Sequence, residues 1–186
     1  ANCTTPSNLF HLLRRQMLTK FRKPLILFTP KSLLRHPKVI SNVDDLTKSK
    51  FIPVITDSEI DPAKADSLVF CSGKFYFDLI EYREKNNIKN VAIVRIEQLF
   101  PLPVKLIISE IKKFSKAEDI VWAQEEPRNM GAWNHIQTYH PIAKNMRPAT
   151  RRFYGSTASG SLTKFERRHN QVIEYVFDKT KNNFRK

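Results

Sequence analysis

Residues 119–133 read DIVWAQEEPRNMGAW, and this stretch decides the fold. Its first part, Ile120 to Gln124, is a short run without charge, which predicts a strand buried on both faces. A polar turn with two carboxylates, a proline, an asparagine and a glycine follows, and a helix is expected from Gly131 to about His140. Open α/β sheets bind ligands where such strands end, and a helix N-terminus favours an anion. The stretch therefore predicts a strand-to-helix junction near a functional edge.

Strand-like and helix-like patterns alternate through residues 66–186. Expected strands lie at 68–71, 91–96, 120–124 and 152–154, and expected helices lie at 75–86, 104–114 and 165–177. Strands that alternate with helices of ten or more residues indicate a mainly parallel sheet with helices on both faces. We therefore predict an α/β domain, a three-layer sandwich, from about 66 to 186. Its polar, basic tail (179–186) is expected to fray.

The first thirty residues predict a helix and a strand that lack partners of their own. Apolar residues recur at helical spacing from Ser7 to about Thr19, after a Thr-Thr-Pro start that suits a helix N-terminus. Residues 24–28 (PLILF) are fully apolar and predict a strand. Because this unit cannot bury both its faces alone, residues 1–30 are expected to end another domain. Residues 31–65 are then expected to be an ordered linker.

A formal net charge of +14 on 186 residues is the most unusual feature of the composition. Such a charge is typical of proteins that bind nucleic acid or a membrane surface, or of a basic face on part of a larger, more acidic protein. The basic residues are spread along the chain without an aromatic-interleaved RNA motif, which favours the second interpretation. No apolar run approaches the roughly 18 residues of a membrane helix.

Glycine and cysteine are too scarce for several kinds of chemistry. The chain has 4 Gly, none before Gly73, which suits a protein whose phosphate-binding loops lie elsewhere. Cys3 and Cys71 cannot form a disulfide framework and have no metal-binding spacing. We expect free thiols in a soluble, intracellular protein, with no metal site. Ala1 does not look like a natural start, so we expect the C-terminal part of a longer chain.

Four segments resemble 2-oxoglutarate dehydrogenase, the thiamine-diphosphate-dependent decarboxylating component of its complex. The first is the Gln-Glu-Glu-Pro-x-Asn-x-Gly-Ala-Trp pattern of residues 124–133. The others, in family order, are 4–8 with 11–16 (TTPSN, HLLRRQ), 29–37 (TPKSLLRHP), and 71–74 with 91–99 (CSGK, VAIVRIEQL). The resemblance covers roughly residues 2 to 133. It is weaker beyond, where Ser156 and Leu162 replace an arginine and a proline of the family.

The resemblance implies a domain similar to the C-terminal domain of transketolase, preceded by the last helix-strand unit of the pyrimidine-binding domain. It also implies a homodimeric citric-acid-cycle enzyme that decarboxylates 2-oxoglutarate on thiamine diphosphate with Mg. The enzyme then succinylates the lipoyl group of dihydrolipoamide succinyltransferase. It would work in the cytoplasm of a bacterium or the mitochondrial matrix of a eukaryote. The cofactor would be bound mainly by upstream domains, so no catalytic residue is expected here and this chain alone should be inactive.

Two alternatives to this function stay open. A close relative that acts on 2-oxoadipate shares the same motifs, and only the substrate pocket would distinguish it. A basic nucleic-acid-binding or regulatory domain would instead explain the net charge, and would bind with an affinity that falls steeply with salt.

The resemblance implies a role at the active-site mouth or a subunit contact for part of the 124–133 stretch. Glu125 and Glu126 are neighbours on an extended strand and point to opposite faces, so they are not expected to act on one atom. In transketolase-like relatives the comparable loop shapes the active-site mouth. That role is implied for Glu125, Glu126, Asn129 and Trp133. His36 is added because it follows a domain-ending strand, with an ordinary turn histidine as the alternative.

Ser72-Gly73-Lys74 raises the question of a phosphate site. The P-loop pattern fails, since Leu68 stands where a glycine is needed and Phe75 replaces the Ser or Thr. A plain strand-to-helix turn is therefore the simpler interpretation. Relatives of the family can carry a regulatory acetyl-CoA or AMP site in this region. The candidate residues for that effector are Ser72, Lys74, Arg151 and Arg152.

Overall fold

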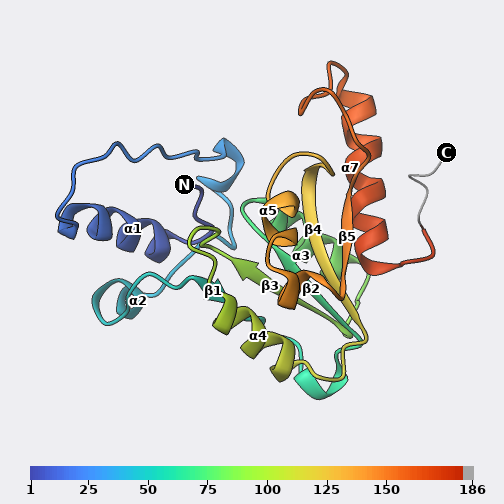
Figure 1. Cartoon of the computed structure of the whole chain (residues 1–186), viewed down its shortest axis with the longest axis horizontal. Helices are drawn as coiled ribbons and strands as arrows, with labels where there is room; N and C mark the ends of the chain where they lie inside the picture. Colours follow the sequence, from blue (N-terminus) through green and yellow to red (C-terminus); the bar gives the residue numbers. More distant parts are fainter. Residues whose placement is uncertain (182–186) are drawn as a thin grey trace.

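The computed structural model describes residues 1–181, and these contain a five-stranded sheet between two layers of helices (Figure 1). The strands are β1 (Val54–Ile55), β2 (Ser67–Cys71), β3 (Val91–Ile96), β4 (Asp119–Pro127) and β5 (Met146–Arg151). Their order is β1-β3-β2-β4-β5, with β1 antiparallel to β3 and all other neighbours parallel. The expected three-layer, mainly parallel architecture is confirmed.

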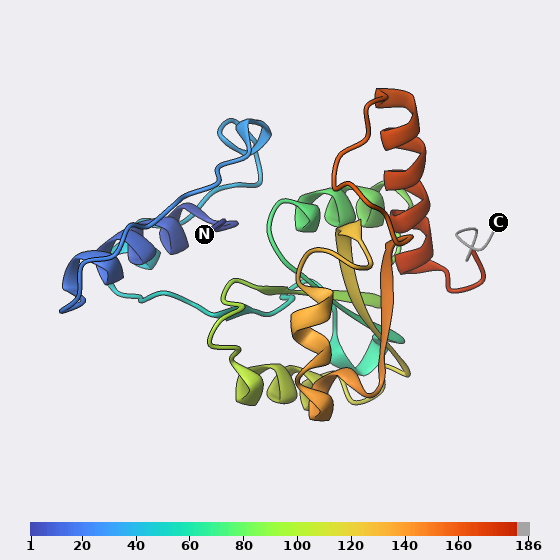
Figure 2. The same cartoon turned by 45° about the horizontal axis from the view of Figure 1, so that its top comes forward.

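The helices are α1 (Pro6–Leu18), α2 (Val43–Thr47), α3 (Phe75–Lys85), α4 (Val104–Lys113), α5 (Trp133–Gln137), α6 (His140–Ala143) and α7 (Leu162–Phe177), with short 3-10 turns η1 (Lys31–Leu33) and η2 (Pro62–Lys64). Five of the helices cover the two faces of this sheet, and α1 and α2 lie to one side of it (Figure 2). Helices α4, α5 and α6 pack on one face, and α3 and α7 pack on the other. No helix among residues 1–181 is long and apolar enough to cross a membrane.

The central strand β2 shows why an uninterrupted apolar run becomes the middle of the sandwich. All five of its residues are buried. Leu68 and Phe70 pack into the core under α4 and α5, whereas Val69 and Cys71 pack into the core under α3 and α7. Successive side chains of a strand point to opposite faces, so each layer needs its own apolar set.

The expected strand at 24–28 is wrong. The segment is extended, but its backbone bonds only to the chain start: the Ala1 amino group donates to the Ile26 carbonyl (2.6 Å), and Phe28 N donates to the Ala1 carbonyl (2.8 Å). Among the described residues no second strand lies beside it. Ile26 and Phe28 accordingly remain 63% and 69% exposed. An apolar run becomes a strand only when another strand satisfies its backbone.

The expected strand at 152–154 is also wrong, because the last parallel strand is β5, at Met146–Arg151. The aromatic pair at 153–154 has a higher strand propensity than the residues of β5. The segment of β5 also contains Pro148, and proline is uncommon inside strands. The ladder to β4 nevertheless runs from Ile120 opposite Met146 to Ala123 opposite Ala149. An edge position needs hydrogen bonds on one side only, so it tolerates a proline.

The single helix expected from 131 to about 140 is two short helices, α5 and α6. The break falls at Thr138 and Tyr139, just before the His140-Pro141 pair. A proline disfavours helical geometry in the residue before it and suits the first turn of a new helix. Residues 182–186, part of the tail expected to fray, lie outside the described residues.

The expected linker of residues 31–65 adds an antiparallel edge strand, β1, to the sheet. Directly after β1, the buried carboxylate of Asp57 accepts hydrogen bonds from the Arg83 guanidinium and from Ile93 N (2.8 Å). Arg83 is 2% exposed and also donates to the Val91 carbonyl (3.2 Å). The second half of this segment is therefore fastened to α3 and β3 by a buried ion pair. It belongs structurally with the sandwich.

Candidate functional site at the carboxyl edge of the sheet

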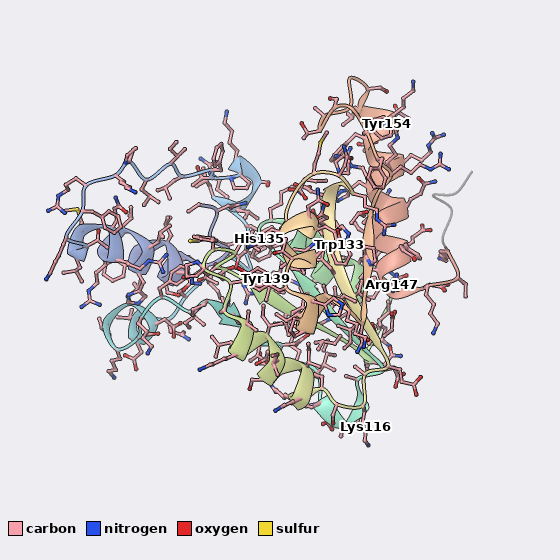
Figure 3. The ribbon with its side chains drawn as sticks, in the orientation of Figure 1. Lys116, Trp133, His135, Tyr139, Arg147 and Tyr154 are labelled. Carbon is pink, nitrogen blue, oxygen red and sulfur yellow. The ribbon has the colours of Figure 1, made fainter. Side chains whose placement is uncertain are left out.

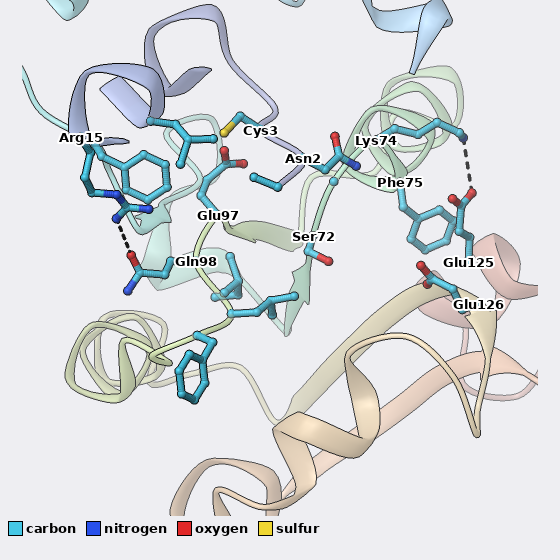
Figure 4. A pocket seen from close by; sticks show the side chains of 17 residues that line it. Asn2, Cys3, Arg15, Ser72, Lys74, Phe75, Glu97, Gln98, Glu125 and Glu126 are labelled. Carbon is cyan, nitrogen blue, oxygen red and sulfur yellow. Dashed lines mark hydrogen bonds and ion pairs between the residues drawn. The ribbon is translucent and has the colours of Figure 1, made fainter. Parts of the chain in front are cut away.

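A cavity of about 400 Å³ lies where β2, β3 and β4 end (Figure 4). The N-terminal segment and α1 form one wall, and the strand ends with the start of α3 form the other. Its polar and charged lining residues include Asn2, Arg15, Ser72, Lys74, Glu97, Gln98, Glu125 and Glu126. This is the edge at which parallel α/β sheets bind ligands.

The buried amide of Gln124 holds the turn that follows β4. Its Oε1 accepts from the Trp122 indole Nε1 and from the backbone N of Trp133, both at 2.9 Å. Its Nε2 donates to the carbonyls of Pro127 (3.2 Å) and Met130 (2.7 Å). All four hydrogen-bonding positions of the amide are satisfied, although the residue is only 3% exposed. One side chain therefore fixes both ends of the 124–133 turn.

Gly131 is required by the same amide. Its φ is +66°, in the left-handed region that favours glycine. A Cβ on this residue would lie 2.9 Å from Gln124 Nε2 and 3.1 Å from the Glu126 Cβ. Glycine is therefore favoured at position 131 for two reasons, its left-handed backbone and the close approach of the Gln124 and Glu126 side chains.

Asn129 and Trp133, both expected at the active-site mouth, occupy different environments. The Asn129 side chain donates to the Tyr154 carbonyl (2.9 Å) and accepts from Tyr154 N (3.0 Å), which ties the loop after β5 to the turn after β4. Trp133 is 3% exposed and packs in the core under α5 (Figure 3). It supports the turn from inside and does not line the cavity, which corrects its expected place.

Glu125 and Glu126 both line the cavity but differ in their partners. Glu125 lies 3.5 Å from the Lys74 ammonium, whereas Glu126 has no ion-pair partner among the described residues. Burial raises the pKa of Glu126, and the charge of Glu125 adds to this effect, against its own backbone hydrogen bond and the charge of Arg151. The two carboxyl groups therefore share one cavity but differ in their partners, and the expectation that they point to opposite faces stays a prediction.

Lys74 belongs to a charge network that joins α3, β4 and α7. Its ammonium donates to Asp78 Oδ2 (2.6 Å), and the His169 Nε2 lies 3.3 Å from the same oxygen. Burial lowers the pKa of Lys74, but Asp78 and Glu125 outweigh it and leave that pKa above its ordinary value. Burial would raise the pKa of Asp78, but hydrogen bonds with His169 and Lys74 leave it lowered.

This network also brings together three groups of the kind that bind metals, which no sequence spacing indicated. Ligand atoms of Asp78, Glu125 and His169 all lie within 4.8 Å of one another. The Lys74 ammonium already pairs with both carboxylates. The Lys74 ammonium therefore already supplies the positive charge that a metal ion would bring to these carboxylates.

The predicted anion-binding residues do not form one free site. Lys74 is paired as described, and Arg151 donates to the carbonyls of Glu125 (2.6 Å) and Thr157 (2.7 Å). Arg152 is exposed, whereas Ser72 lines the cavity. His36 lies elsewhere: its Nδ1 accepts from Lys38 N (3.3 Å), and its ring packs 4.9 Å from that of Phe77. A turn histidine against α3 is the simpler description of His36.

Glu97 is a site residue that sequence reasoning missed. Its carboxylate accepts from Thr4 N and from Asn8 Nδ2, both at 3.1 Å, and from the Thr4 hydroxyl. Thr4 and Asn8 are each 1% exposed. The contact joins the family-like segment at 4–16 to the one at 91–99 and fastens α1 to the end of β3. Thr4 and Asn8 each lie about 90 residues before Glu97 in the chain, so no local sequence pattern could have indicated the contact.

Both cysteines are free, as expected. Burial, aided by the charge of Glu97, raises the pKa of the Cys3 thiol to about 11, although it lies on the cavity wall. Burial raises the pKa of Cys71 to about 12. Both thiols are therefore protonated at neutral pH and poor nucleophiles.

A parallel α/β sheet with a polar cavity at its carboxyl edge defines a broad class of ligand-binding domains. Within that class, residues 40–177 match the family model described as 2-oxoglutarate dehydrogenase C-terminal, and the chain belongs to this family. The split-gene transketolase in its inactive β4 tetramer gives a TM-score of 0.48 at 12% identity, over 74% of this chain and 44% of that one.

Curated relatives match most of the length of this chain. The 2-oxoglutarate dehydrogenase E1 component of Cupriavidus necator is 42% identical over 185 residues, which is 96% of this chain and 19% of the relative. That of Brucella anthropi is 45% identical over 183 residues, 88% of this chain and 18% of the relative. The chain thus spans about a fifth of the length of these relatives.

Replacing Gly131 by Ala tests the geometry of the turn. The variant should lower the free energy of unfolding by about 1–3 kcal/mol, because Ala is strained at this φ and crowds Gln124. Urea unfolding followed by tryptophan fluorescence measures it. Gly155→Ala is the matched control, since no atom lies within 4 Å of a Cβ there. An equal effect of both substitutions would contradict the proposed geometry.

Replacing Glu126 by Gln tests its buried environment. Its pKa in the folded protein is raised above the ordinary 4.5, so its contribution to stability is present below that pH and is lost as the pH rises through the raised pKa. Glu126→Gln should therefore melt a few degrees above the parent at pH 7, and the gap should close near pH 4. Differential scanning fluorimetry measures both, with the exposed Glu118→Gln as control. A difference in melting temperature that grows as the pH falls would contradict the predicted direction of the pKa effect.

Proposed function

We propose that this chain acts as the C-terminal part of a 2-oxoglutarate dehydrogenase E1 component. The whole enzyme would oxidatively decarboxylate 2-oxoglutarate and pass the succinyl group to the lipoyl group of dihydrolipoamide succinyltransferase. It would do so within the multienzyme complex of the citric acid cycle, in the bacterial cytoplasm or the mitochondrial matrix. The family match across residues 40–177 is the observation that carries this proposal.

Thiamine diphosphate would supply the nucleophile and electron sink for such a reaction. A Mg²⁺-bound diphosphate needs oxygen ligands for the metal and free donors for the phosphates. Among residues 1–181, the one carboxylate-rich group of this kind is Asp78, Glu125 and His169, and Lys74 already pairs with its carboxylates. These residues do not fit the diphosphate and its metal. We therefore assign the cofactor to other parts of the polypeptide, and this chain alone should have no turnover.

The contribution of this chain would be to shape the mouth of the active site and a subunit contact in a homodimer. Glu125 and Glu126 reach the cavity at the carboxyl edge, and Asn129 fixes the neighbouring loop. Trp133 supports them from the core. His36 packs against α3 and would act only through a contact with another subunit.

The central test is an activity measurement on the full-length polypeptide that carries this chain. It should release CO₂ from 2-oxoglutarate only when thiamine diphosphate and Mg²⁺ are added, and the 186-residue chain alone should release none. A preference for 2-oxoadipate would assign the enzyme to that relative. Full-length protein that is inactive on both acids yet binds a labelled oligonucleotide at low salt would overturn the proposal in favour of a nucleic-acid-binding domain.

An effector site for acetyl-CoA or AMP at Ser72, Lys74, Arg151 and Arg152 stays a prediction. An anion would have to draw Lys74 away from Asp78 and Glu125. If it does so, Lys74→Ala should weaken effector binding to the full-length enzyme roughly tenfold, the effect of one lost charge-assisted hydrogen bond. Calorimetry measures this against the exposed control Lys116→Ala. Unchanged affinity in Lys74→Ala would dispose of the site.

A further inference from the structure

The loop from 152 to 161 and the start of α7 lie at one end of the molecule (Figure 1). They carry large apolar side chains that are exposed. Phe153 is 69% exposed, Leu162 is 71% exposed, and Tyr154 is 39% exposed. All three come from one stretch of chain, 153–162, and several exposed apolar side chains together are typical of interaction surfaces, whereas single exposed residues are ordinary. We call the surface formed by Phe153, Tyr154 and Leu162 with the exposed basic residues Arg152, Lys164 and Arg167 the loop surface.

The loop surface is held in place although it is exposed. Asn129 bonds both backbone groups of Tyr154, and Arg151 bonds the Thr157 carbonyl at 2.7 Å. The Arg168 guanidinium lies 4.5 Å from the centroid of the Tyr154 ring and donates to its hydroxyl. Figure 3 shows Tyr154 beside α7. A surface ordered before binding loses little conformational entropy when a partner arrives.

The charge of this region selects the kind of partner. Residues 151–170 contain five Lys or Arg and one acidic residue, Glu166. Arg152, Lys164 and Arg167 are exposed. A second copy of this chain docked here by two-fold symmetry would bring the same cations face to face. An acidic protein surface with apolar patches of its own is complementary in both charge and polarity.

The loop surface lies at the same edge of the sheet as the cavity. It follows the carboxyl end of β5, and Asn129 joins it to the turn that carries Glu125 and Glu126. In the proposed function, on which this step rests, the acceptor of the succinyl group is a lipoyl group attached to another protein. We propose that the loop surface docks the lipoyl-bearing domain of that partner through an acidic, partly apolar face.

The test uses the full-length enzyme and two acceptors for the same chemistry. Reductive succinylation of an isolated lipoyl domain needs docking, whereas 2-oxoglutarate-dependent ferricyanide reduction does not. The double variant Phe153→Ser with Leu162→Ser should raise KM for the lipoyl domain roughly tenfold and leave ferricyanide reduction unchanged. Val43→Ser, which removes an apolar side chain 73% exposed on the distant helix α2, is the control for surface polarity.

Charge gives a second, independent variant. Arg152→Glu should also raise KM for the lipoyl domain, and the parent KM should rise with salt, because screening weakens attraction between exposed charges. An unchanged KM in both variants would overturn the docking proposal, as would an equal loss with both acceptors. If the variants lose oligonucleotide binding but keep the parent KM for the lipoyl domain, the loop surface binds nucleic acid and the docking proposal is wrong. A parent enzyme that reduces no ferricyanide with 2-oxoglutarate would instead refute the proposed function.

Discussion

The buried amide of Gln124 is the interaction on which the candidate site depends. Four hydrogen bonds from one side chain tie the end of β4, the polar turn and the start of α5 into one unit. A buried amide with any of these bonds missing would carry an uncompensated desolvation cost. This cost favours the one arrangement of the turn in which all four hydrogen bonds form. In that arrangement residue 131 lies so close to the amide that only a glycine fits.

Further polar contacts surround the cavity and hold its walls. Asn129 carries the geometry outward to the loop after β5, and Lys74 fixes Glu125 against α3. On the opposite wall Glu97 fastens Thr4 and Asn8. Three of the four family-like segments, 4–16, 71–99 and 124–133, thus line the same edge of the sheet. These segments are distant in sequence and adjacent in space, and their polar contacts hold the walls of the cavity together.

Sequence patterns predicted the sandwich because burial on both faces leaves an unmistakable apolar run, as at Leu68–Cys71 and Val91–Ile96. They failed where a strand is defined by its neighbour. Residues 24–28 have the composition of a strand and no neighbouring strand within the described residues, whereas β5 contains Pro148 and pairs well with β4. The site was predicted in part: Glu125 and Glu126 reach the cavity, but the partners of Lys74 and the role of Glu97 depend on contacts that no local pattern encodes.

Amide hydrogen exchange at Trp133 tests the central role of Gln124 most directly. The Trp133 backbone N begins α5 and donates to Gln124 Oε1 at 2.9 Å. In a Gln124→Leu variant, protection of this amide should fall about tenfold or more, the equivalent of one lost hydrogen bond, while amides within β3 keep their protection. Unchanged protection at Trp133 would show that the turn holds without the amide and would contradict this account of the site.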